Sequence, residues 1–277
     1  MIYEKAHAKV NLSLSVFPKR ADGYHEVKTI MVPLDLYDEL YFEDSSEFIY
    51  NANVKYDNDI CLKVYDIMNK IYRFNKGVKI TLSKHIPSEA GLAGGSADAA
   101  ALVRGLNRYY NLNMTLDDMY NVVNQVGSDV AYCISNRPSI CSGRGEIVSF
   151  LDINKIDIDI LLIKPNFGAS TALVYKNYIP QNIDRNENDS NIIKAIKDNN
   201  IKLLKDNIYN DLKESCLKVS EAESIIFKEL EALGLNVYLS GSGTTIYTFD
   251  VNNENISKFI DNHQECKFIR TKIKYFM

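Results

Sequence analysis

Hydrophobic and polar residues alternate strictly along the segment from Ala8 to Val16. Because successive side chains of a β-strand point to opposite faces, this alternation predicts a half-buried strand. The polar face brings Lys9 and Asn11 close together, and the apolar face consists of Val10, Leu12, Leu14 and Val16. From this strand alone, a polar face exposed to solvent is the simpler interpretation of Lys9 and Asn11.

A second strand, predicted over residues 78–82, leads into a glycine-rich segment, residues 86–101, after which apolar residues recur at helical spacing. Gly94 and Gly95 allow backbone conformations closed to other residues and leave room for a ligand. The free N–H groups and the positive dipole end of the following helix attract anions, above all phosphate. Ser96 adds a hydroxyl that could bind a phosphate oxygen or a metal ion, or could cap the helix.

Glycines alone leave two interpretations of this loop open. The segment lacks the Gly-Lys-Ser/Thr sequence of a Walker A loop and the G-x-G-x-x-G fingerprint of dinucleotide-binding folds. A tight turn before an alanine-rich helix therefore explains the glycines as well as a phosphate site does.

The remainder of the first half predicts helices and turns. Apolar residues at helical spacing favour a helix over residues 58–74, and Thr115 is placed as the N-cap of another, which ends near Gly127. Asp129 follows this glycine closely, and its position alone would assign it to a cap or a turn. The glycines that flank Arg144 predict a turn at a strand edge.

The second half follows the order strand, helices, strand, strand, helix, strand, which is typical of a split βαβ, or ferredoxin-like, arrangement. We expect its strands at residues 158–163, 235–239, 245–249 and 267–273, and its last helix at 256–262. Ser220 and Glu223 form the sequence pattern of a capping box for the helix that Gly234 ends.

The order of the elements predicts an α+β protein with two domains. A short charged stretch at residues 152–157 suggests a boundary, which gives domains of residues 1–155 and 156–277. Polar residues gather at 182–191, where we expect a mobile loop.

Composition narrows the class of protein further. The 277 residues are 46% hydrophobic and 25% charged, which is ordinary for a globular chain. The net charge of −4 argues against a nucleic-acid partner. Five scattered cysteines and four histidines lack metal-site spacing, which argues against zinc and fits a reducing cytosol. Without a signal-peptide pattern or an apolar run of ~18 residues, we expect a cytoplasmic protein with no membrane partner, monomeric or homodimeric.

The whole glycine-rich string is more specific than its glycines. The pattern Pro87-x-x-x-Gly91-Leu92-x-Gly94-Gly95-Ser96-Ala97-x-Ala99-Ala100 resembles the ATP-binding loop of the GHMP kinases. The resemblance implies a two-domain fold, with an N-terminal ribosomal S5-like nucleotide-binding domain and a C-terminal ferredoxin-like domain. It also implies that ATP, with Mg²⁺, binds at Pro87, Gly91, Leu92, Ala93, Gly94, Gly95, Ser96 and Ala97.

The metal ligands stay undetermined at this point. Ser96 is a candidate contact through Mg²⁺-bound ATP, because a hydroxyl and phosphates suit this hard ion. Glu89 and Asp98 could touch the metal, but each could equally be a helix-terminus or packing residue.

Two further strings resemble GHMP kinase motifs and carry the catalytic candidates. The string Ala8-Lys9-Val10-Asn11-Leu12 resembles the first motif. Lys9 is then a compact cation able to act on the γ-phosphate or to lower the pKa of a neighbouring group. The string Gly127-Ser128-Asp129-Val130 resembles the second, in which the aspartate lies at the transferring phosphate. Asp129 either accepts the proton of the attacking hydroxyl or mainly orients that hydroxyl, and the sequence leaves both roles open. A third string, residues 239–245, resembles the third motif with Thr244 in place of its usual proline.

The loop after the first strand bears on the substrate. The string Arg20-x-Asp22-Gly23-Tyr24-His25-Glu26 is expected to form a turn that presents Tyr24 and His25 outward. An aromatic ring can stack on a flat heterocycle while imidazole hydrogen-bonds its edge. The string resembles a motif of those GHMP kinases that act on a cytidine-diphosphate-linked methylerythritol. There the histidine and tyrosine recognise cytosine.

The same resemblance completes the substrate site. It implies that Thr171 faces the substrate and that Tyr175 stacks on the cytosine, although Tyr175 as a core residue is the competing interpretation. Asn11 and Asp129 are the remaining substrate-binding candidates.

The implied reaction is ATP-dependent phosphorylation of the substrate's 2-hydroxyl, a step of the non-mevalonate route to isoprenoid precursors. A homoserine or mevalonate-type kinase is the enzymatic alternative, and a metabolite-binding module without catalysis is the other. The combination of Lys9, Ser96 and Asp129 favours a kinase, because a pure binder has no need of it. The ferredoxin-like half lacks the basic patches with interleaved aromatics that a nucleic-acid binder would need.

Overall fold

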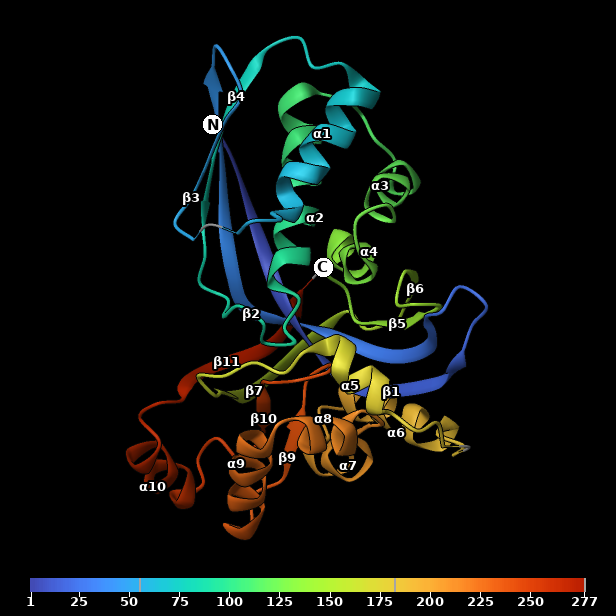
Figure 1. Cartoon of the computed structure of the whole chain (residues 1–277), viewed down its shortest axis with the longest axis vertical. Coiled ribbons are helices and arrows are strands. Elements are labelled where there is room, and N and C mark those ends of the chain that lie inside the picture. Colours follow the sequence, from blue (N-terminus) through green and yellow to red (C-terminus); the bar gives the residue numbers. More distant parts are fainter. Residues whose placement is uncertain (55, 182, 277) are drawn as a thin grey trace.

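Two long antiparallel strands, β1 (Ile2–Lys19) and β2 (His25–Ser45), run through the molecule and connect its two halves (Figure 1). The computed structural model describes residues 1–54, 56–181 and 183–276. In the first half, β2 pairs with β4 (Gly77–Ser83), which pairs in turn with β3 (Ile49–Ala52). A single bridge from β2 to β11 (Lys267–Phe276) links this sheet to the second half.

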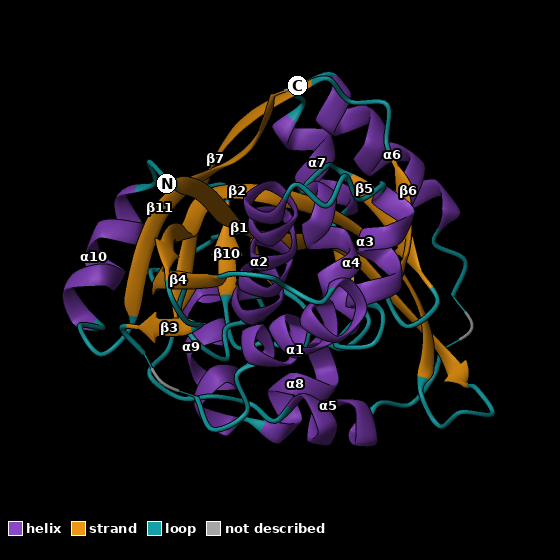
Figure 2. Cartoon of the chain, turned by 90° about the horizontal axis from the view of Figure 1, so that it is seen from above, coloured by secondary structure: helices purple, strands orange, loops and turns teal. Residues whose placement is uncertain are grey.

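Helices gather on one side of β1 and β2 in the first half, as Figures 1 and 2 show. They are α1 (Ile60–Tyr72), α2 (Gly94–Tyr110), α3 (Leu116–Val123) and α4 (Ser128–Ser135). Helix α2 lies closest to the sheet, since a Cβ on Gly105 would lie 2.0 Å from the ring of Phe42. The hairpin of β5 (Ser139–Ser142) and β6 (Ile147–Phe150) contains the predicted turn at Arg144.

The second half confirms the predicted βαββαβ order. Its strands lie in the order β11-β7-β10-β9, where β7 is Lys155–Lys164, β9 is Val237–Leu239 and β10 is Ile246–Thr248. Between β7 and β9 the chain forms α5 (Thr171–Asn177), α6 (Asn186–Lys197), α7 (Ile201–Asn207), β8 (Tyr209–Asn210), α8 (Lys213–Val219) and α9 (Glu221–Ala232). Helix α10 (Glu254–Asn262) precedes β11. The two halves share one sheet, and the boundary between 1–155 and 156–277 stays a prediction.

Several predicted bounds are wrong in detail. The helix that Thr115 caps ends at Val123 with Asn124 as its C-cap, and Gly127 is instead the N-cap of the next helix, α4. The mobile loop expected at 182–191 is wrong for residues 186–191, which form the start of α6, and residue 182 lies outside the described residues. Among the described residues, no helix combines the length and the apolar character needed to cross a membrane.

The polar face of β1 is buried, so the half-buried strand with a solvated polar face is a wrong prediction. Lys9 is 3% exposed and Asn11 4%, and the next two residues of this face, Ser13 and Ser15, are buried as well. Strand β8 pairs with β1 at Ser13, and the hydroxyl of Ser15 bonds that of Tyr209 at 2.8 Å. At Ser13 and Ser15 the second half therefore covers a face that looks solvent-exposed when the strand is considered alone.

Only one of the two hydrogen bonds of the predicted capping box of α9 is present. The Ser220 hydroxyl accepts the N–H of Glu223 at 3.3 Å, as expected. The Glu223 carboxylate turns inward instead, is fully buried, and accepts the thiol of Cys216 at 3.2 Å. Residues 239–245, the string that resembles the third motif, form a turn that we call the third glycine turn. The carboxylate lies beneath this turn, since a Cβ on Gly243 would lie 3.2 Å from its Oε1 atom. The carboxylate thus supports a turn that lines the pocket described below.

Replacing this buried carboxyl should change how stability depends on pH. Burial, partly opposed by Cys216 and Lys164, raises the pKa of Glu223 from 4.5 to about 7. The folded state therefore holds a proton that the unfolded chain releases, and its stabilising contribution is complete below pH 4.5 and lost as the pH rises through about 7. The free energy of unfolding should fall by about 2–3 kcal/mol more between pH 5 and 8 in the wild type than in Glu223→Gln.

Urea denaturation at the two pH values measures this difference. Glu221→Gln, which removes an exposed carboxyl from the same helix, is the matched control and should retain the wild-type dependence. If Glu223→Gln and Glu221→Gln depend on pH in the same way, the buried carboxyl is not the titrating group.

Candidate active site

A pocket of about 1180 Å³ lies where the glycine-rich loop, the start of α4 and the third glycine turn meet. It brings together residues from distant parts of the sequence that were predicted to act in one site: Lys9, Asn11, Tyr24, His25, Pro87, Gly91, Ala93, Gly94, Gly95, Ser96, Asp129, Thr171 and Tyr175. Two predicted nucleotide contacts, Leu92 and Ala97, are buried in the core and do not line this pocket. The amide of Ala97 already donates to the carbonyl of Ala93.

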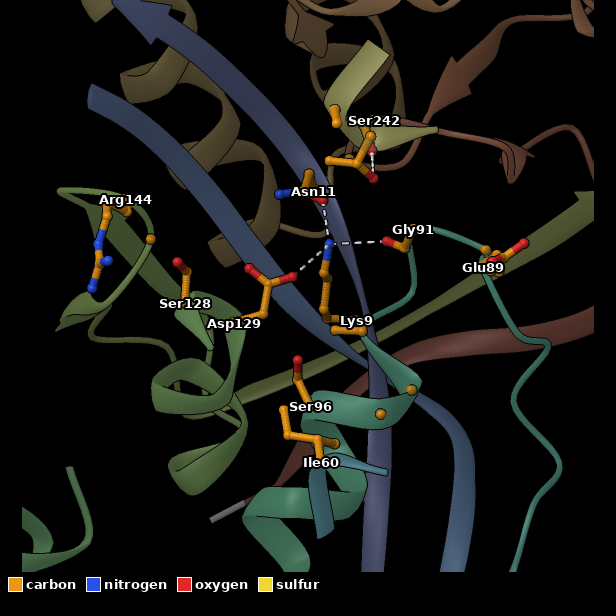
Figure 3. Close-up of a pocket in the computed structure, with 18 of the residues that line it drawn as sticks. Lys9, Asn11, Ile60, Glu89, Gly91, Ser96, Ser128, Asp129, Arg144 and Ser242 are labelled. Carbon is orange, nitrogen blue, oxygen red and sulfur yellow. Dashed lines mark hydrogen bonds and ion pairs between the residues drawn. The ribbon is translucent and has the colours of Figure 1, made fainter. Parts of the chain in front are cut away.

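Lys9 lines the pocket and lies between Asn11, Gly91 and Asp129 (Figure 3). Its ammonium donates to Asn11 Oδ1 at 2.7 Å and to the carbonyl of Gly91 at 2.9 Å. The same nitrogen lies 3.7 Å from Asp129 Oδ2, and the aspartate is 36% exposed toward the pocket. Asn11 in turn donates to the Thr29 hydroxyl at 2.7 Å, so the ammonium is held in one place before any ligand binds.

The N-terminus of α2 opens into the pocket without a side-chain cap. Its N-cap is Ala93, in the left-handed conformation with φ of 59°, and no side chain of the described residues bonds this helix end. Ser96 lies in the first turn with a half-buried hydroxyl, and the described part of the chain gives that hydroxyl no hydrogen-bond partner. Ser96 therefore does not cap the helix. Unpaired amides and the helix dipole make this end suitable for an anion.

The glycine-rich loop and the third glycine turn interlock. Gly91 has φ of +68°, and a Cβ there would lie 2.3 Å from the carbonyl oxygen of Ser240. The Ser240 hydroxyl donates to the Gly91 carbonyl at 3.0 Å, and the amide of Thr245 donates to the carbonyl of Ala90 at 3.3 Å. The second half of the chain thus fixes the loop that carries the open helix end.

The other end of the pocket contains Tyr24, His25 and Tyr175. Tyr24 is 57% exposed, but His25 is 8% exposed and points inward, so the prediction that both face outward is wrong for His25. The His25 Nδ1 atom lies 2.7 Å from the carbonyl of Phe17, an acceptor, which assigns the ring proton to Nδ1. Its Nε2 atom is then an acceptor without a partner in the described residues.

Tyr175 packs against a hydrophobic cluster and also lines the pocket beside His25. Its ring centroid lies 5.7 Å from that of His25, and burial raises the pKa of its hydroxyl to about 12. Thr171 begins the same helix, which Ser170 caps, and the Thr171 hydroxyl bonds the Ser242 hydroxyl at 2.8 Å. This end of the pocket therefore combines aromatic rings, an imidazole acceptor and hydroxyls.

Sequence reasoning missed several residues of this pocket. Arg144, assigned to a structural turn, lines it with its guanidinium 5.2 Å from the centre of the Tyr24 ring, and its two flanking glycines were the available signal. Ser242 was passed over inside the third glycine turn. Lys84 gave no signal, because its partners Asp38 and Asp98 are distant in sequence.

The residues considered for a metal lie in different surroundings. Glu89 is on the rim and points away from Lys9 in Figure 3, and Asp98 is buried in an ion pair with Lys84. Within the described residues, no group of three or more His, Cys, Asp or Glu side chains could hold a metal ion.

An anion site, a fixed ammonium and a partly exposed carboxylate thus meet in one pocket, which is what transfer of a phosphoryl group requires. The family model for the N-terminal domain of GHMP kinases matches residues 59–137, which include the open start of α2 and Asp129. Fold and site together define a GHMP kinase.

Relatives narrow the class to one family. The chain is 36% identical to 4-diphosphocytidyl-2-C-methyl-D-erythritol kinase of Caldanaerobacter subterraneus, over 88% of this chain and 86% of that protein. It is 39% identical to the enzyme of the same name from Acetivibrio thermocellus, over 88% of each chain. A crystal structure of 4-(cytidine 5'-diphospho)-2C-methyl-D-erythritol kinase matches 98% of both chains with a TM-score of 0.80 and 25% identity. The chain belongs to the family of 4-diphosphocytidyl-2-C-methyl-D-erythritol kinases.

More distant structures share the fold alone. A homoserine kinase from Cytophaga hutchinsonii matches 99% of this chain and 95% of its own, with a TM-score of 0.68 and 13% identity. A mevalonate kinase from Methanococcus jannaschii matches with a TM-score of 0.65 and 17% identity, over 98% of both chains.

Proposed function

We propose that this protein transfers the γ-phosphoryl group of ATP to the 2-hydroxyl of 4-diphosphocytidyl-2-C-methyl-D-erythritol, which gives the 2-phosphate and ADP. The reaction is a step of the methylerythritol phosphate route to isoprenoid precursors. One observation carries the proposal: the Lys9–Asp129 pair, 3.7 Å apart, lies in the same pocket as the open end of α2 and the His25 acceptor.

ATP is proposed to bind with its phosphates at the N-terminus of α2. The amides of Gly94, Gly95 and Ser96 need a partner there, and an anion is the partner that the helix dipole favours. Mg²⁺ fits this site with phosphate oxygens as its main ligands and the unbonded Ser96 hydroxyl as the protein contact. When bound, the ion neutralises phosphate charge during transfer.

Lys9 and Asp129 are the proposed catalytic residues. The ammonium of Lys9, fixed by Asn11 and Gly91, stabilises the negative charge of the transferring group. Asp129 faces the pocket from the first turn of α4 and orients the substrate hydroxyl or accepts its proton. Phosphoryl transfer depends mainly on the position of the reacting groups and on stabilisation of their charge. The hydrogen bonds that hold the Lys9 ammonium in place therefore favour catalysis.

The nucleobase end of the pocket is proposed to bind the cytosine. The free Nε2 of His25 can accept a hydrogen bond from the exocyclic amino group of cytosine, while Tyr24 and Tyr175 offer ring faces. Thr171 and Asn11 supply the remaining polar contacts to the substrate.

Two alternatives fit less well. The homoserine and mevalonate kinases resemble this chain only in fold, at 13% and 17% identity, whereas relatives at 36–39% identity carry the name of the cytidine-substrate enzyme. Burying a charged ammonium costs free energy. A binding module without catalysis does not need such a buried ammonium beside Asp129.

The function is tested by ADP release from purified protein with ATP and Mg²⁺, with and without 4-diphosphocytidyl-2-C-methyl-D-erythritol. Release that requires this substrate supports the proposal. ATP binding without such release contradicts the substrate, and homoserine and mevalonate are then the compounds to assay.

His25→Ala should weaken binding of the cytidine substrate while leaving ATP binding intact. Loss of one hydrogen bond to the base should raise KM for this substrate by about 10- to 100-fold. His85→Ala is the matched control, since His85 is exposed and lies outside this pocket. An unchanged KM in steady-state kinetics of His25→Ala would contradict the cytosine assignment.

Cellular setting and assembly are proposed as well. All five cysteines, which lie within the described residues, are free and buried, and this fits the reducing cytoplasm. We also propose that the protein is a monomer or a homodimer and that it has no nucleic-acid partner.

A further inference from the structure

The ammonium of Lys84 lies between two buried carboxylates behind the glycine-rich loop. It is 2.5 Å from Asp38 Oδ2 and 2.5 Å from Asp98 Oδ2. Their side chains are 5%, 0% and 4% exposed, in the order Lys84, Asp38, Asp98. Asp38 belongs to β2, Lys84 directly follows β4, and Asp98 lies near the start of α2, so the cluster joins three elements.

The three side chains hold the glycine-rich loop at both ends. Asp38 Oδ1 accepts the amide of Ile86 at 2.8 Å and also accepts the amide of His85, and these two residues begin the loop. Asp98, beyond the loop, is bound to the same ammonium as Asp38. The loop between residues 86 and 94 therefore starts and ends on one buried network.

The ammonium also lies directly against the glycine that opens the helix. A Cβ on Gly94 would lie 3.4 Å from Lys84 Nζ and 3.0 Å from a methyl group of Ile86. Gly94 thus lies against the cluster, which places the Lys84 ammonium beside the first residue of α2.

The cluster depends on its single cation. Burial raises the pKa of the Asp98 carboxyl, and Lys84 opposes this effect. Burial alone would lower the pKa of Lys84, but the charges of Asp98 and Asp38 outweigh it and raise that pKa. Without the ammonium, Asp98 would lose its bond to Lys84 and Asp38 would keep only the two loop amides. Two buried carboxyl groups would then face each other without a cation, which destabilises the arrangement of the segments that carry them.

We propose that Lys84, together with Asp38 and Asp98, is a positioning residue that holds the glycine-rich loop in its nucleotide-binding shape before the nucleotide arrives. The inference rests on the proposed binding of ATP at this loop. A loop ordered in advance loses less conformational entropy on binding, so the cluster strengthens binding through the loop amides.

Lys84→Met tests this role, because methionine fills a similar volume without the charge. KM for ATP should rise at least about 10-fold, while KM for the cytidine substrate stays within about twofold. Hydrogen exchange of the amides of residues 86–96 should become faster in the protein without nucleotide. A change in global stability alone would not produce this split between the two substrates.

Two further variants keep the test decisive. Lys205→Met breaks the ion pair between Lys205 and Asp250 in the second half, whose side chains are 20% and 17% exposed, and should leave KM for ATP unchanged. Asp98→Asn keeps the shape of the cluster and removes one charge, so it should raise KM for ATP by less than the roughly 10-fold expected for Lys84→Met. This variant tests the role of the cluster if Lys84→Met fails to fold.

ATP affinity measured directly by calorimetry separates this inference from the proposed function. If the wild type does not phosphorylate the cytidine substrate but Lys84→Met still loses ATP affinity and loop protection, only the substrate assignment fails. Unchanged ATP affinity and unchanged loop exchange in Lys84→Met, or an equal rise of both KM values, would overturn the positioning role.

Discussion

Asp129→Asn should remove nearly all turnover while leaving ATP binding measurable. The carboxylate lies 3.7 Å from the fixed ammonium of Lys9, in the pocket that is proposed to bind both ATP and the cytidine substrate. Loss of a positioned acid–base group lowers kcat by about 10²- to 10⁴-fold. Because Asp129 is 36% exposed and receives no other ion pair in the described residues, the substitution should leave folding intact.

Steady-state kinetics of ADP release and calorimetric titration with ATP measure the two effects separately. Glu89→Gln is the control, because it removes another exposed carboxylate that lines the same pocket but does not contact Lys9. A kcat near the wild-type value in Asp129→Asn would sink the catalytic assignment.

The same position can separate the two roles that the sequence leaves open. Asparagine can still hydrogen-bond the substrate hydroxyl but cannot take its proton, whereas alanine can do neither. If Asp129→Asn and Asp129→Ala are equally inactive, proton transfer or charge is the essential contribution. If Asp129→Asn is at least about 10-fold faster than Asp129→Ala, orientation of the hydroxyl contributes most.

Local patterns in the sequence were sufficient for the parts of the site that depend on neighbouring residues. Strand alternation placed Lys9 and Asn11 side by side, and their side chains lie 2.7 Å apart. The glycines and the apolar spacing after them predicted a strand, a loop and a helix start, which the structure has at β4 and α2. These features follow from periods of two and 3.6 residues, which a short window of sequence contains.

Features that depend on distant contacts could not be predicted in this way. Lys9 is buried between the glycine-rich loop, whose Gly91 carbonyl it contacts, and the turn that contains Gly241. The cluster of Asp38, Lys84 and Asp98 joins residues from three elements. Glu223 has the sequence context of a capping residue, yet tertiary packing turns its carboxylate inward, toward Cys216. In these cases contacts between separate elements, and not the local periodicity of the sequence, decide where the side chain lies.

Gly91→Ala should show how strongly the two glycine turns depend on each other. The backbone of Gly91 has φ of +68°, which costs an alanine about 1–2 kcal/mol. Its Cβ would also lie 2.3 Å from the carbonyl oxygen of Ser240 and 2.9 Å from that of Gly243, and both are backbone atoms. The two turns must then move apart, so the free energy of unfolding should fall by about 2–5 kcal/mol.

Turnover should fall as well, because the carbonyl of Gly91 accepts the ammonium of Lys9 at 2.9 Å and the hydroxyl of Ser240 at 3.0 Å. Gly234→Ala is the matched control: its φ is +76°, and a Cβ there meets no described atom within 4 Å. In Gly234→Ala the free energy of unfolding should fall only by the backbone strain, about 1–2 kcal/mol, and kcat should stay unchanged. Urea denaturation and ADP release compare the two variants. If Gly91→Ala is no more damaging than Gly234→Ala, contact between the turns does not hold Lys9 in position.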